Sequence, residues 1–192
     1  LEGRGGGHYH NITAYENQGH GFAPTYDTAW TNCTAARNGK SGFRINAAAV
    51  RLTNCKAWWS GYRRPSSFGA QYNAGFWFTG GSRGSIATGC EAQDNYADGF
   101  FFDGVKGHSC YGCISDSNNR HGSSYVGVSF VGAYGNTFQG FVYDRYNDSV
   151  RYQPRALKFK TGAYANSVKI MHRQFGGGAT DTALQYINHF SD

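Results

Sequence analysis

The sequence has no apolar run that approaches the ~20 residues of a membrane-spanning helix. Its first residues, LEGRGGGHYHN, also lack the apolar segment of a secretory signal peptide. We therefore expect a chain that does not insert into a membrane.

Methionine, leucine and charged residues are scarce, whereas glycine and aromatic residues are abundant. The 192 residues include one Met and 28 Gly, and 17% are aromatic while 16% are charged. Glycine costs roughly 1 kcal/mol inside a helix, whereas aromatic side chains suit the pleated surface of a strand. The length allows one domain with a substantial core. The composition therefore predicts a single all-β domain.

The cysteines do not predict a disulfide framework. Their number is odd, and they are spread along the chain at Cys33, Cys55, Cys90, Cys110 and Cys113. Disulfide-rich domains are short and use an even set of cysteines. Assembly in a reducing cytoplasm is therefore the better interpretation.

Acidic residues are fewer than basic ones, which favours an anionic partner. The formal charge is +6 and the isoelectric point is near 9.1. Nucleic acid, an acidic polysaccharide or a teichoic-acid-like polymer would each fit this charge. The basic residues are scattered, apart from GYRRP at 61–65 and SVRYQPRALKFK at 149–160. Because no dense basic patch stands out, we expect no nucleic-acid partner.

A repeat organises the chain up to about residue 132. NITAYENQGHGF at 11–22 aligns with NCTAARNGKSGF at 32–43 and with GCEAQDNYADGF at 89–100. The Gly-Phe pairs recur after 42 − 21 = 21 residues early in the chain and after 99 − 75 = 24 residues later. Units of this length cannot bury an apolar face alone, but they can when stacked.

Read by columns, the repeat predicts two inward-facing strands in each unit. Each unit begins with a bend column of Asn or Gly, which is followed by small apolar residues at every second position. A polar turn comes next, and then a Gly-Phe pair whose glycine is interpreted as a bend. The bend column is Asn11, Asn32, Asn54, Gly89 and Gly112. The inward columns include Ile12, Cys33, Cys55, Cys90 and Cys113, then Ala14, Ala35, Ala57, Ala92 and Ser115. The turn column is Asn17, Asn38, Ser60, Asn95 and Asn118, and the second strand opens at Phe22, Phe43, Phe76, Phe100 and Val128.

These columns resemble the right-handed parallel β-helix of the pectate-lyase superfamily, and within it the coils of bacteriophage tailspikes and related tail proteins. The resemblance implies an all-β, single-stranded solenoid of 21–24 residues per coil. Residues 1–132 would form regular coils with loop inserts near 60–74 and 118–127. Residues 133–192 would form irregular continuing coils or a C-terminal packing region. Because neither end reads as a cap for open strand edges, we expect a piece of a longer polypeptide.

The first insert, SGYRRPSSFGAQYNA, brings aromatic and basic residues together. An indole face suits stacking on a sugar ring, and arginine suits the carboxylates or phosphates of an anionic glycan. The candidate carbohydrate-binding residues are Trp58, Trp59, Tyr62, Arg63 and Arg64. The alternative is that the tryptophans pack beneath their own loop or face a neighbouring subunit.

Trp77 and Phe101 fall on the outward side of the strand that follows the Gly-Phe pair, one coil apart. Exposed aromatic residues on a flat parallel sheet imply a partner surface. In the tailspikes that the sequence resembles, three β-helices associate side by side. The resemblance thus implies a homotrimer with Trp77 and Phe101 in the subunit interface, and a sugar platform is the alternative.

Asp94, Asp116 and Asp98 are the candidate catalytic residues. Asp94 and Asp116 fall in neighbouring columns of adjacent coils, so their Cα atoms should lie on the order of 5–7 Å apart. Such a pair could match the ~5 Å or the ~6.5–9.5 Å separation of glycosidase carboxylates. Nearby options for an acid, a base or a cation ligand are Asp98, Asp103, His108 and His121. The alternative is that acids in turns serve only local hydrogen bonding and solvation.

Lyases of the superfamily that the sequence resembles hold Ca²⁺ with a cluster of acids on one outward strand. No outward strand column of this sequence carries three acids. This departure from the pattern argues against pectate-lyase activity in particular, and we expect no bound metal and no cofactor.

Three hypotheses follow from the sequence. The first is a segment of a bacteriophage tailspike or tail host-recognition protein that binds anionic or neutral bacterial surface polysaccharide. It would contact other tail proteins in the virion tail, after assembly in the host cytoplasm, with a secreted or cell-surface location as the alternative. The second is a polysaccharide depolymerase, either a glycoside hydrolase or a lyase. The third is a structural β-helix spacer.

Overall fold

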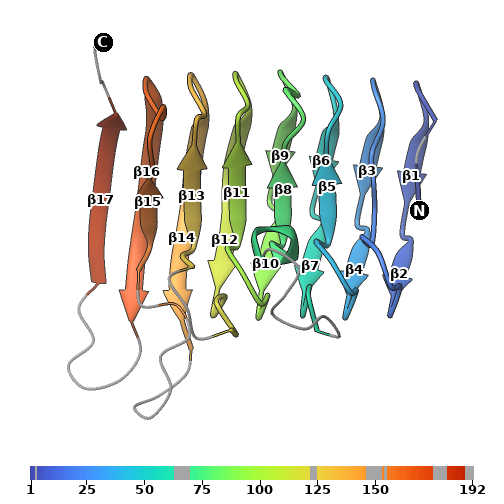
Figure 1. Cartoon of the computed structure of the whole chain (residues 1–192), viewed down its shortest axis with the longest axis horizontal. Coiled ribbons are helices and arrows are strands. Elements are labelled where there is room, and N and C mark those ends of the chain that lie inside the picture. The colour runs from blue at the N-terminus through green and yellow to red at the C-terminus, as the bar shows by residue number, and fades with distance from the viewer. Residues whose placement is uncertain are drawn as a thin grey trace.

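The computed structural model describes residues 1–2, 4–62, 70–121, 125–145, 153, 155–174 and 181–188. In these residues the chain winds into a stack of coils whose strands run side by side along the stack (Figure 1). Successive coils pair in parallel, with His8 beside Ala29 and Ala29 beside Arg51. The molecule is therefore a parallel β-helix, and the predicted fold is confirmed.

The coils build a 12-stranded sheet and a five-stranded sheet. Early coils each add two short strands to the larger sheet: β1 (His8–His10) and β2 (Thr13–Tyr15), β3 (Ala29–Thr31) and β4 (Thr34–Ala36), β6 (Arg51–Thr53) and β7 (Lys56–Trp58), β9 (Ile86–Thr88) and β10 (Glu91–Gln93). Later coils merge the two into one strand: β12 (Ser109–Asp116), β14 (Thr137–Asp144) and β16 (Asn166–Gln174). The smaller sheet consists of β5 (Phe43–Ile45), β8 (Phe76–Phe78), β11 (Phe100–Asp103), β13 (Val128–Val131) and β15 (Leu157–Phe159). A 3-10 turn, η1 (Ala70–Asn73), precedes β8.

The sequence columns miss the first strand of each coil. Its inward column runs through Tyr9, Trp30, Leu52, Ala87 and Cys110, which pair in register. No residue type repeats in this column, so a search for self-similarity cannot find it. The large side chains lie in the first coils, where the Tyr9 and Trp30 rings stack with their centroids 4.1 Å apart.

Two bends in each coil require a left-handed backbone. The predicted column of Asn11, Asn32, Asn54, Gly89 and Gly112 has φ values of 51° to 62°, which confirms it. A second column with φ values of 51° to 56° contains Glu16, Arg37, Trp59, Asp94 and Ser117. The sequence indicates only a turn for this second column, because none of its members is Asn or Gly. Side chains of these types make a left-handed backbone unfavourable by about 1–3 kcal/mol per residue.

We expect Glu16→Gly to raise the free energy of unfolding by about 1 kcal/mol, because glycine removes the steric cost of a left-handed backbone. The lost ion pair with Arg37, 3.5 Å long and about a third exposed, offsets little of this gain. Thr13→Gly, on an exposed strand position of the same coil, should destabilise instead. Urea denaturation compares the two variants, and equal losses would contradict the account of the bend.

Like side chains stack in the core, as the columns predict. Phe22, Phe43, Phe76 and Phe100 form one stack, with neighbouring ring centroids 4.8–4.9 Å apart. Phe78, Phe102, Phe130 and Phe159 form a second, with spacings of 4.6–5.2 Å. All five cysteines are buried and free. The predicted inward columns are therefore confirmed.

The polar turn column forms a ladder of amide hydrogen bonds between coils. Asn17 Nδ2 donates to Asn38 Oδ1 at 2.8 Å, and Asn95 Nδ2 donates to Asn118 Oδ1 at the same distance. Gln153 extends the ladder, since its Oε1 accepts from Asn118 Nδ2 at 2.9 Å. Buried amides of this kind link coils and satisfy backbone carbonyls that would otherwise lack partners.

The glycine of each Gly-Phe pair lies at a bend, as predicted, and it is also required for space. Gly42, Gly75 and Gly99 do not have positive φ values. A Cβ on Gly42 would lie 2.5 Å from the Ala57 Cβ and 2.9 Å from the carbonyl oxygen of Gly75. The next coil approaches so closely that only glycine fits.

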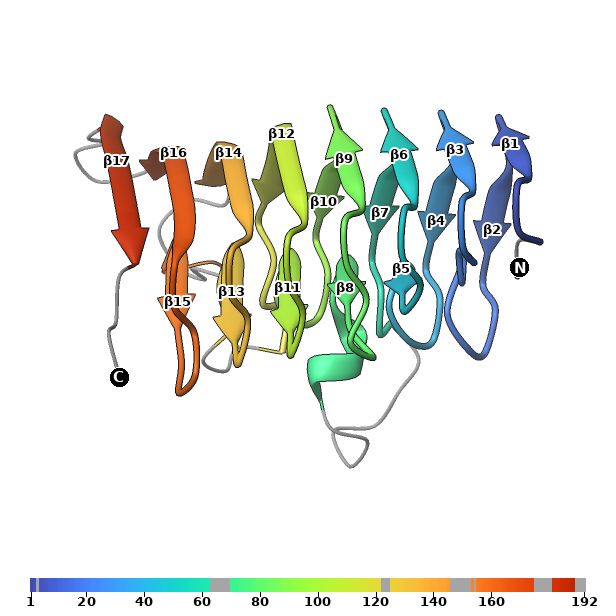
Figure 2. The same ribbon diagram turned by 90° about the horizontal axis from the view of Figure 1, so that it is seen from above.

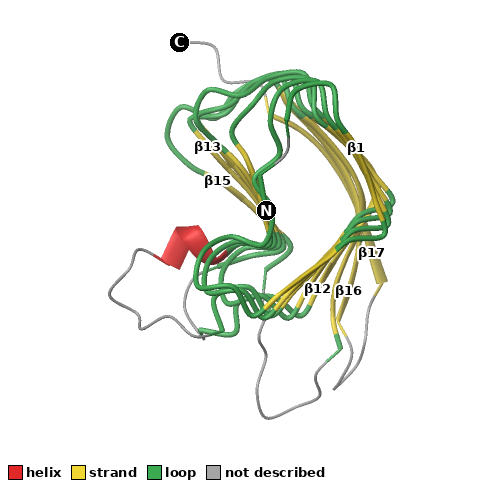
Figure 3. Ribbon diagram, turned by 90° about the vertical axis from the view of Figure 1, so that its right-hand side faces the viewer, coloured by secondary structure: helices red, strands yellow, loops and turns green. Residues whose placement is uncertain are grey.

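The two sheets enclose the core from opposite sides. Seen along the stack, β13 and β15 lie across the core from β1, β12 and β16, and η1 lies beside the five-stranded sheet (Figure 3). At the C-terminal end, β17 (Asp181–Asn188) pairs antiparallel with β16 (Figure 2). Among the described residues, no helix has the length and apolar character needed to cross a membrane.

Candidate functional site

Asp94 and Asp116 lie together at the ends of β10 and β12. The Asp94 N–H donates to the Asp116 carbonyl at 3.0 Å, and only 2% and 1% of these residues are exposed. The Arg145 guanidinium joins them, with Nη2 2.7 Å from Asp94 Oδ2 and Nε 2.8 Å from Asp116 Oδ2. Burial raises the pKa of Asp116 to about 6, although the Ser117 hydrogen bond and Arg145 oppose the rise. A catalytic role stays a prediction, and the burial favours a structural role.

Arg145→Met is expected to lower the free energy of unfolding by about 2 kcal/mol. Breaking a fully buried ion pair costs about 3–5 kcal/mol, and the Arg145 side chain is 40% exposed, which reduces the effect. The loss should be larger at pH 8 than at pH 5, because Asp116, with a pKa of about 6, is uncharged at the lower pH. Adding Asp116→Asn to the Arg145→Met variant should recover part of the lost free energy of unfolding. Urea denaturation at both pH values measures the effect, and a loss independent of pH would contradict this account.

Three of the predicted carbohydrate-binding residues, Trp58, Trp59 and Tyr62, lie at the end of β7 and in the turn that follows. Trp58 and Trp59 are half-buried. The Arg120 guanidinium lies over the Trp59 ring, 4.9 Å from its centroid, and the Tyr62 ring meets Trp59 edge-on at 5.6 Å. These contacts favour the alternative that Trp59 packs beneath its own loop, and the carbohydrate role stays a prediction. The remaining two candidates, Arg63 and Arg64, lie outside the described residues.

The predicted exposure of Trp77 and Phe101 is wrong. Both lie in register on the outer face of the five-stranded sheet, yet only 6% of each is exposed. The Tyr72 ring, from η1, meets Trp77 edge-on at 4.9 Å, and the indole N–H donates to Asp103 Oδ2 at 3.2 Å. Strand alternation fixes the face on which a side chain lies, but η1 folds back over that face. A subunit-interface role for these two residues stays a prediction.

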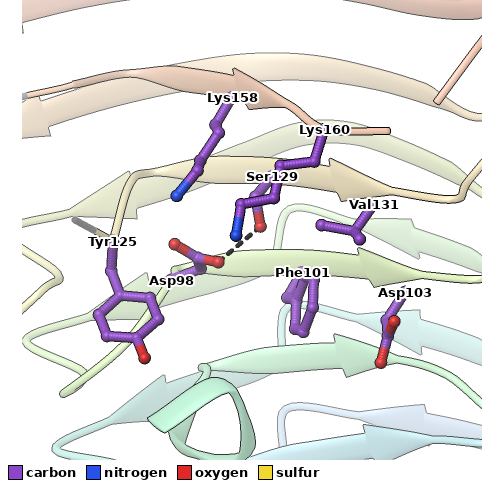
Figure 4. Close-up of a pocket in the computed structure, with 8 residues that line it drawn as sticks. All are labelled: Asp98, Phe101, Asp103, Tyr125, Ser129, Val131, Lys158 and Lys160. Carbon is purple, nitrogen blue, oxygen red and sulfur yellow. Dashed lines mark hydrogen bonds between the residues drawn. The ribbon is translucent and has the colours of Figure 1, made fainter. Parts of the chain in front are cut away.

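A pocket opens beside Phe101 on the same outer face (Figure 4). Its volume is about 260 Å³, and its lining residues are Asp98, Phe101, Asp103, Tyr125, Ser129, Val131, Lys158 and Lys160. The sheet register explains why these residues converge, because two adjacent outward rows run across β11, β13 and β15. The first row consists of Phe101, Ser129 and Lys158. The second consists of Asp103, Val131 and Lys160, the residue that follows β15.

Asp98 is the buried acid of this pocket. Its Oδ2 accepts a hydrogen bond from Ser129 Oγ, and its Oδ1 accepts one from the Val126 N–H, both at 2.6 Å. Burial raises the pKa of Asp98 to about 6, against the opposing effect of these bonds and of the two lysines. The side chains of Lys158 and Lys160 point towards Asp98 and Ser129 (Figure 4). Asp98 can therefore change charge near neutral pH while facing two amino groups.

The two amino groups make the pocket suitable for an anion. Burial lowers the pKa of Lys158, and the like charge of Lys160 lowers it further. An anionic ligand between the amines would relieve this repulsion and gain charge-assisted hydrogen bonds. The pocket therefore combines two carboxyl groups, those of Asp98 and Asp103, with two amino groups that suit an anion.

The two candidate histidines contact other protein groups. His108 is fully buried, with Nε2 3.2 Å from Ser82 Oγ and Nδ1 accepting the Ser85 N–H at 3.2 Å. Burial lowers the pKa of His108 to about 4, so it is neutral at physiological pH. His121 Nε2 lies 3.3 Å from Asn73 Nδ2. In the part of the chain that the structure describes, no three His, Cys, Asp or Glu side chains could hold a metal ion together.

No protein-family model and no curated protein matches this chain. Among solved structures it is similar to full-length tailspike protein 2 of an Escherichia coli O157:H7 bacteriophage, with a TM-score of 0.69 and 16% identity over 88% of this chain and 23% of that one. The enzymatically active domain of bacteriophage CBA120 tailspike protein 2 is similar with a TM-score of 0.68 and 17% identity, over 84% of this chain and 24% of that one. A pectate lyase is similar with a TM-score of 0.56 and 15% identity, over 84% of this chain and 48% of the lyase.

These similarities establish the fold that the chain shares with a phage tailspike and with a pectate lyase, which is the parallel β-helix. The chain spans about a quarter of the length of the tailspike chains, at 23% and 24%, and about half, 48%, of the pectate lyase.

Proposed function

We propose that this chain is a segment of a tailspike-type host-recognition protein that binds acidic bacterial surface polysaccharide in the pocket of the five-stranded sheet. The pair of amino groups from Lys158 and Lys160 carries the proposal, because both point into one pocket. A sugar carboxylate or phosphate would lie between them, and sugar hydroxyls would donate to Asp98 or Asp103. The similarity to a phage tailspike supports a role in host recognition.

Binding to a glycan panel tests this proposal. The panel contains acidic and neutral capsular and O-antigen polysaccharides from Gram-negative bacteria, with polygalacturonate as a simple acidic polymer and dextran as a neutral control. We expect the chain to retain acidic glycans and not to retain dextran. If the folded chain retains no acidic glycan, the proposal is overturned and the structural spacer becomes the better hypothesis.

A polysaccharide depolymerase is the second candidate function, and Asp98 favours it. A carboxyl group whose pKa is raised to about 6 can act as an acid near neutral pH, and Lys158, whose pKa is lowered, can act as a base. Asp98→Asn should then abolish product release while glycan binding persists. Reducing-end and unsaturated-uronate assays measure release, and a wild-type chain that binds glycans without releasing product would exclude this function.

Binding of an acidic glycan is expected to strengthen as the pH falls through about 6, the pKa of Asp98. Above that pH the ionised carboxylate competes with the ligand for Lys158 and Lys160, and below it neutral Asp98 leaves both amines to the ligand. Sugar carboxylates stay ionised at pH 5, because carboxyl groups have ordinary pKa values near ~4. Calorimetry at pH 5 and pH 8 measures the change, and Asp98→Asn should remove it. Equal affinities of the wild-type chain at both values would contradict this linkage.

We also propose that the segment works as a homotrimer that contacts other tail proteins in the virion tail, after assembly in the host cytoplasm. The similarity to tailspike chains supports this setting. Sedimentation tests the assembly, and a strictly monomeric particle at high concentration would overturn the trimer.

A further inference from the structure

A second, smaller pocket lies at the other end of the five-stranded sheet. Its volume is about 160 Å³, and its lining residues are Tyr26, Asn46, Ala48, Gly80, Gly81, Ser82 and Arg83. Asn46 directly follows β5, and Arg83 lies in the turn after β8. Gly80 and Gly81 turn the chain with φ values of 65° and 70°, and neither carries a side chain that would fill the space. The pocket is therefore polar, with one guanidinium and one phenol at its rim.

One outward row of the sheet connects the two pockets. From Asn46 the row passes through Thr79, Asp103, Val131 and Lys160 in successive coils. Adjacent strands lie ~4.8 Å apart, so Asn46 lies about 10 Å from Asp103 and about 19 Å from Lys160 at the backbone. Residues of both pockets therefore lie on one strip of the outer face, which is longer than a single sugar and in which Thr79 is the most buried residue, at 8% exposed.

The charges along this strip follow a simple order. Lys158 and Lys160 stand at one end, and Arg83 stands at the other, where it is exposed. Asp103 lies between them, half-buried, and accepts the Trp77 indole N–H. Cations at both ends and a carboxylate in the middle fit a ligand with anions at its ends and hydroxyl donors between them.

We propose that the strip binds one extended acidic oligosaccharide, with one anionic sugar at Lys158 and Lys160 and a second, further along the same glycan, at Asn46 and Arg83. This inference rests on the proposed function and adds a second subsite to it. Arg83 would pair with the anion, the Asn46 amide would bond to hydroxyls, and the Tyr26 ring, 62% exposed, would cover a sugar face. Affinity should then depend on ligand length, because only a long oligomer reaches both pockets.

Size-defined oligogalacturonates, together with fragments of each acidic polysaccharide that the panel retains, test this subsite. We expect wild-type affinity to rise about tenfold once an oligomer spans both pockets, which is the effect of one additional ionic contact. Arg83→Gln should abolish the rise and leave the binding of short oligomers unchanged. Lys169→Gln is the matched control, because it removes a positive charge from an exposed position on β16 in the other sheet.

The outcomes separate this inference from the proposed function. If Arg83→Gln binds long oligomers as tightly as the wild-type chain, the second subsite is overturned. The proposed function would stand in that case, provided that Lys160→Gln still weakens binding at every length. If the wild-type chain binds no acidic glycan of any length, both are overturned. Circular dichroism checks the fold of each variant, and the exposure of Arg83 makes a folding defect unexpected.

Discussion

Phe102→Ala is expected to lower the free energy of unfolding by about 3–5 kcal/mol, the range found when a buried aromatic side chain is removed. Phe102 is fully buried, and its ring stacks between Phe78 at 4.7 Å and Phe130 at 4.6 Å. Alanine would leave a gap between two coils. Backbone pairing on both sides holds β8 and β13 in place, so the neighbouring rings cannot move in to fill it. Urea denaturation measures the loss.

Phe141→Ala provides the matched control for this prediction. Phe141 lies on the outer face of β14 and is 47% exposed. Because little apolar surface is lost from the core, we expect a change of about 0.5 kcal/mol or less. Similar losses in the two variants would contradict the assignment of inward and outward faces.

Replacing Lys158 and Lys160 together by glutamine is expected to weaken binding of an acidic glycan by about 100-fold, since each charge-assisted contact contributes roughly tenfold. Both side chains line the pocket and point towards Asp98. Glutamine retains hydrogen-bonding capacity and most of the length, so the variant tests charge rather than shape. Calorimetry at pH 5, where Asp98 is largely neutral, gives the clearest comparison.

Lys169→Gln controls for the loss of positive charge in this experiment too. It should leave the affinity within about twofold, because charges more than ~10 Å from a ligand are largely screened at moderate salt. If the double variant binds as tightly as the wild-type chain, the anion does not lie between these two lysines.

The sequence predicts most of the core because the same side chains recur in successive coils. Phe76 and Phe100 repeat at one position and Phe78 and Phe102 at another, so one alignment reveals both the register and the inward face. Alternation alone also places Trp77 correctly on the outer face. It cannot reveal that Tyr72 covers the indole, because that contact depends on how the insert folds.

The candidate site could be predicted only in part. Of the acids that the sequence offers for catalysis, Asp98 and Asp103 line the pocket, whereas Asp94 and Asp116 lie elsewhere. The sequence marks Lys158 and Lys160 only as part of a basic cluster and not as site residues, because they lie beyond residue 132, where the repeated columns loosen. Their alternation in LKFK was a usable signal, since it places both on one face of β15 and the residue after it. Tyr125 lies in the second insert and Ser129 follows it, and both join the pocket only through the stacking of coils.

The proposed binding strip takes its length from the number of coils. Each coil moves the outward row by ~4.8 Å, and each coil pairs only with the coils on either side of it. A duplicated coil between β8 and β11 would therefore move Lys158 and Lys160 one step further from Arg83 without changing the neighbours of either end. Under the proposed binding mode, the length of glycan that is recognised would therefore change by whole coils while both proposed anion subsites are kept.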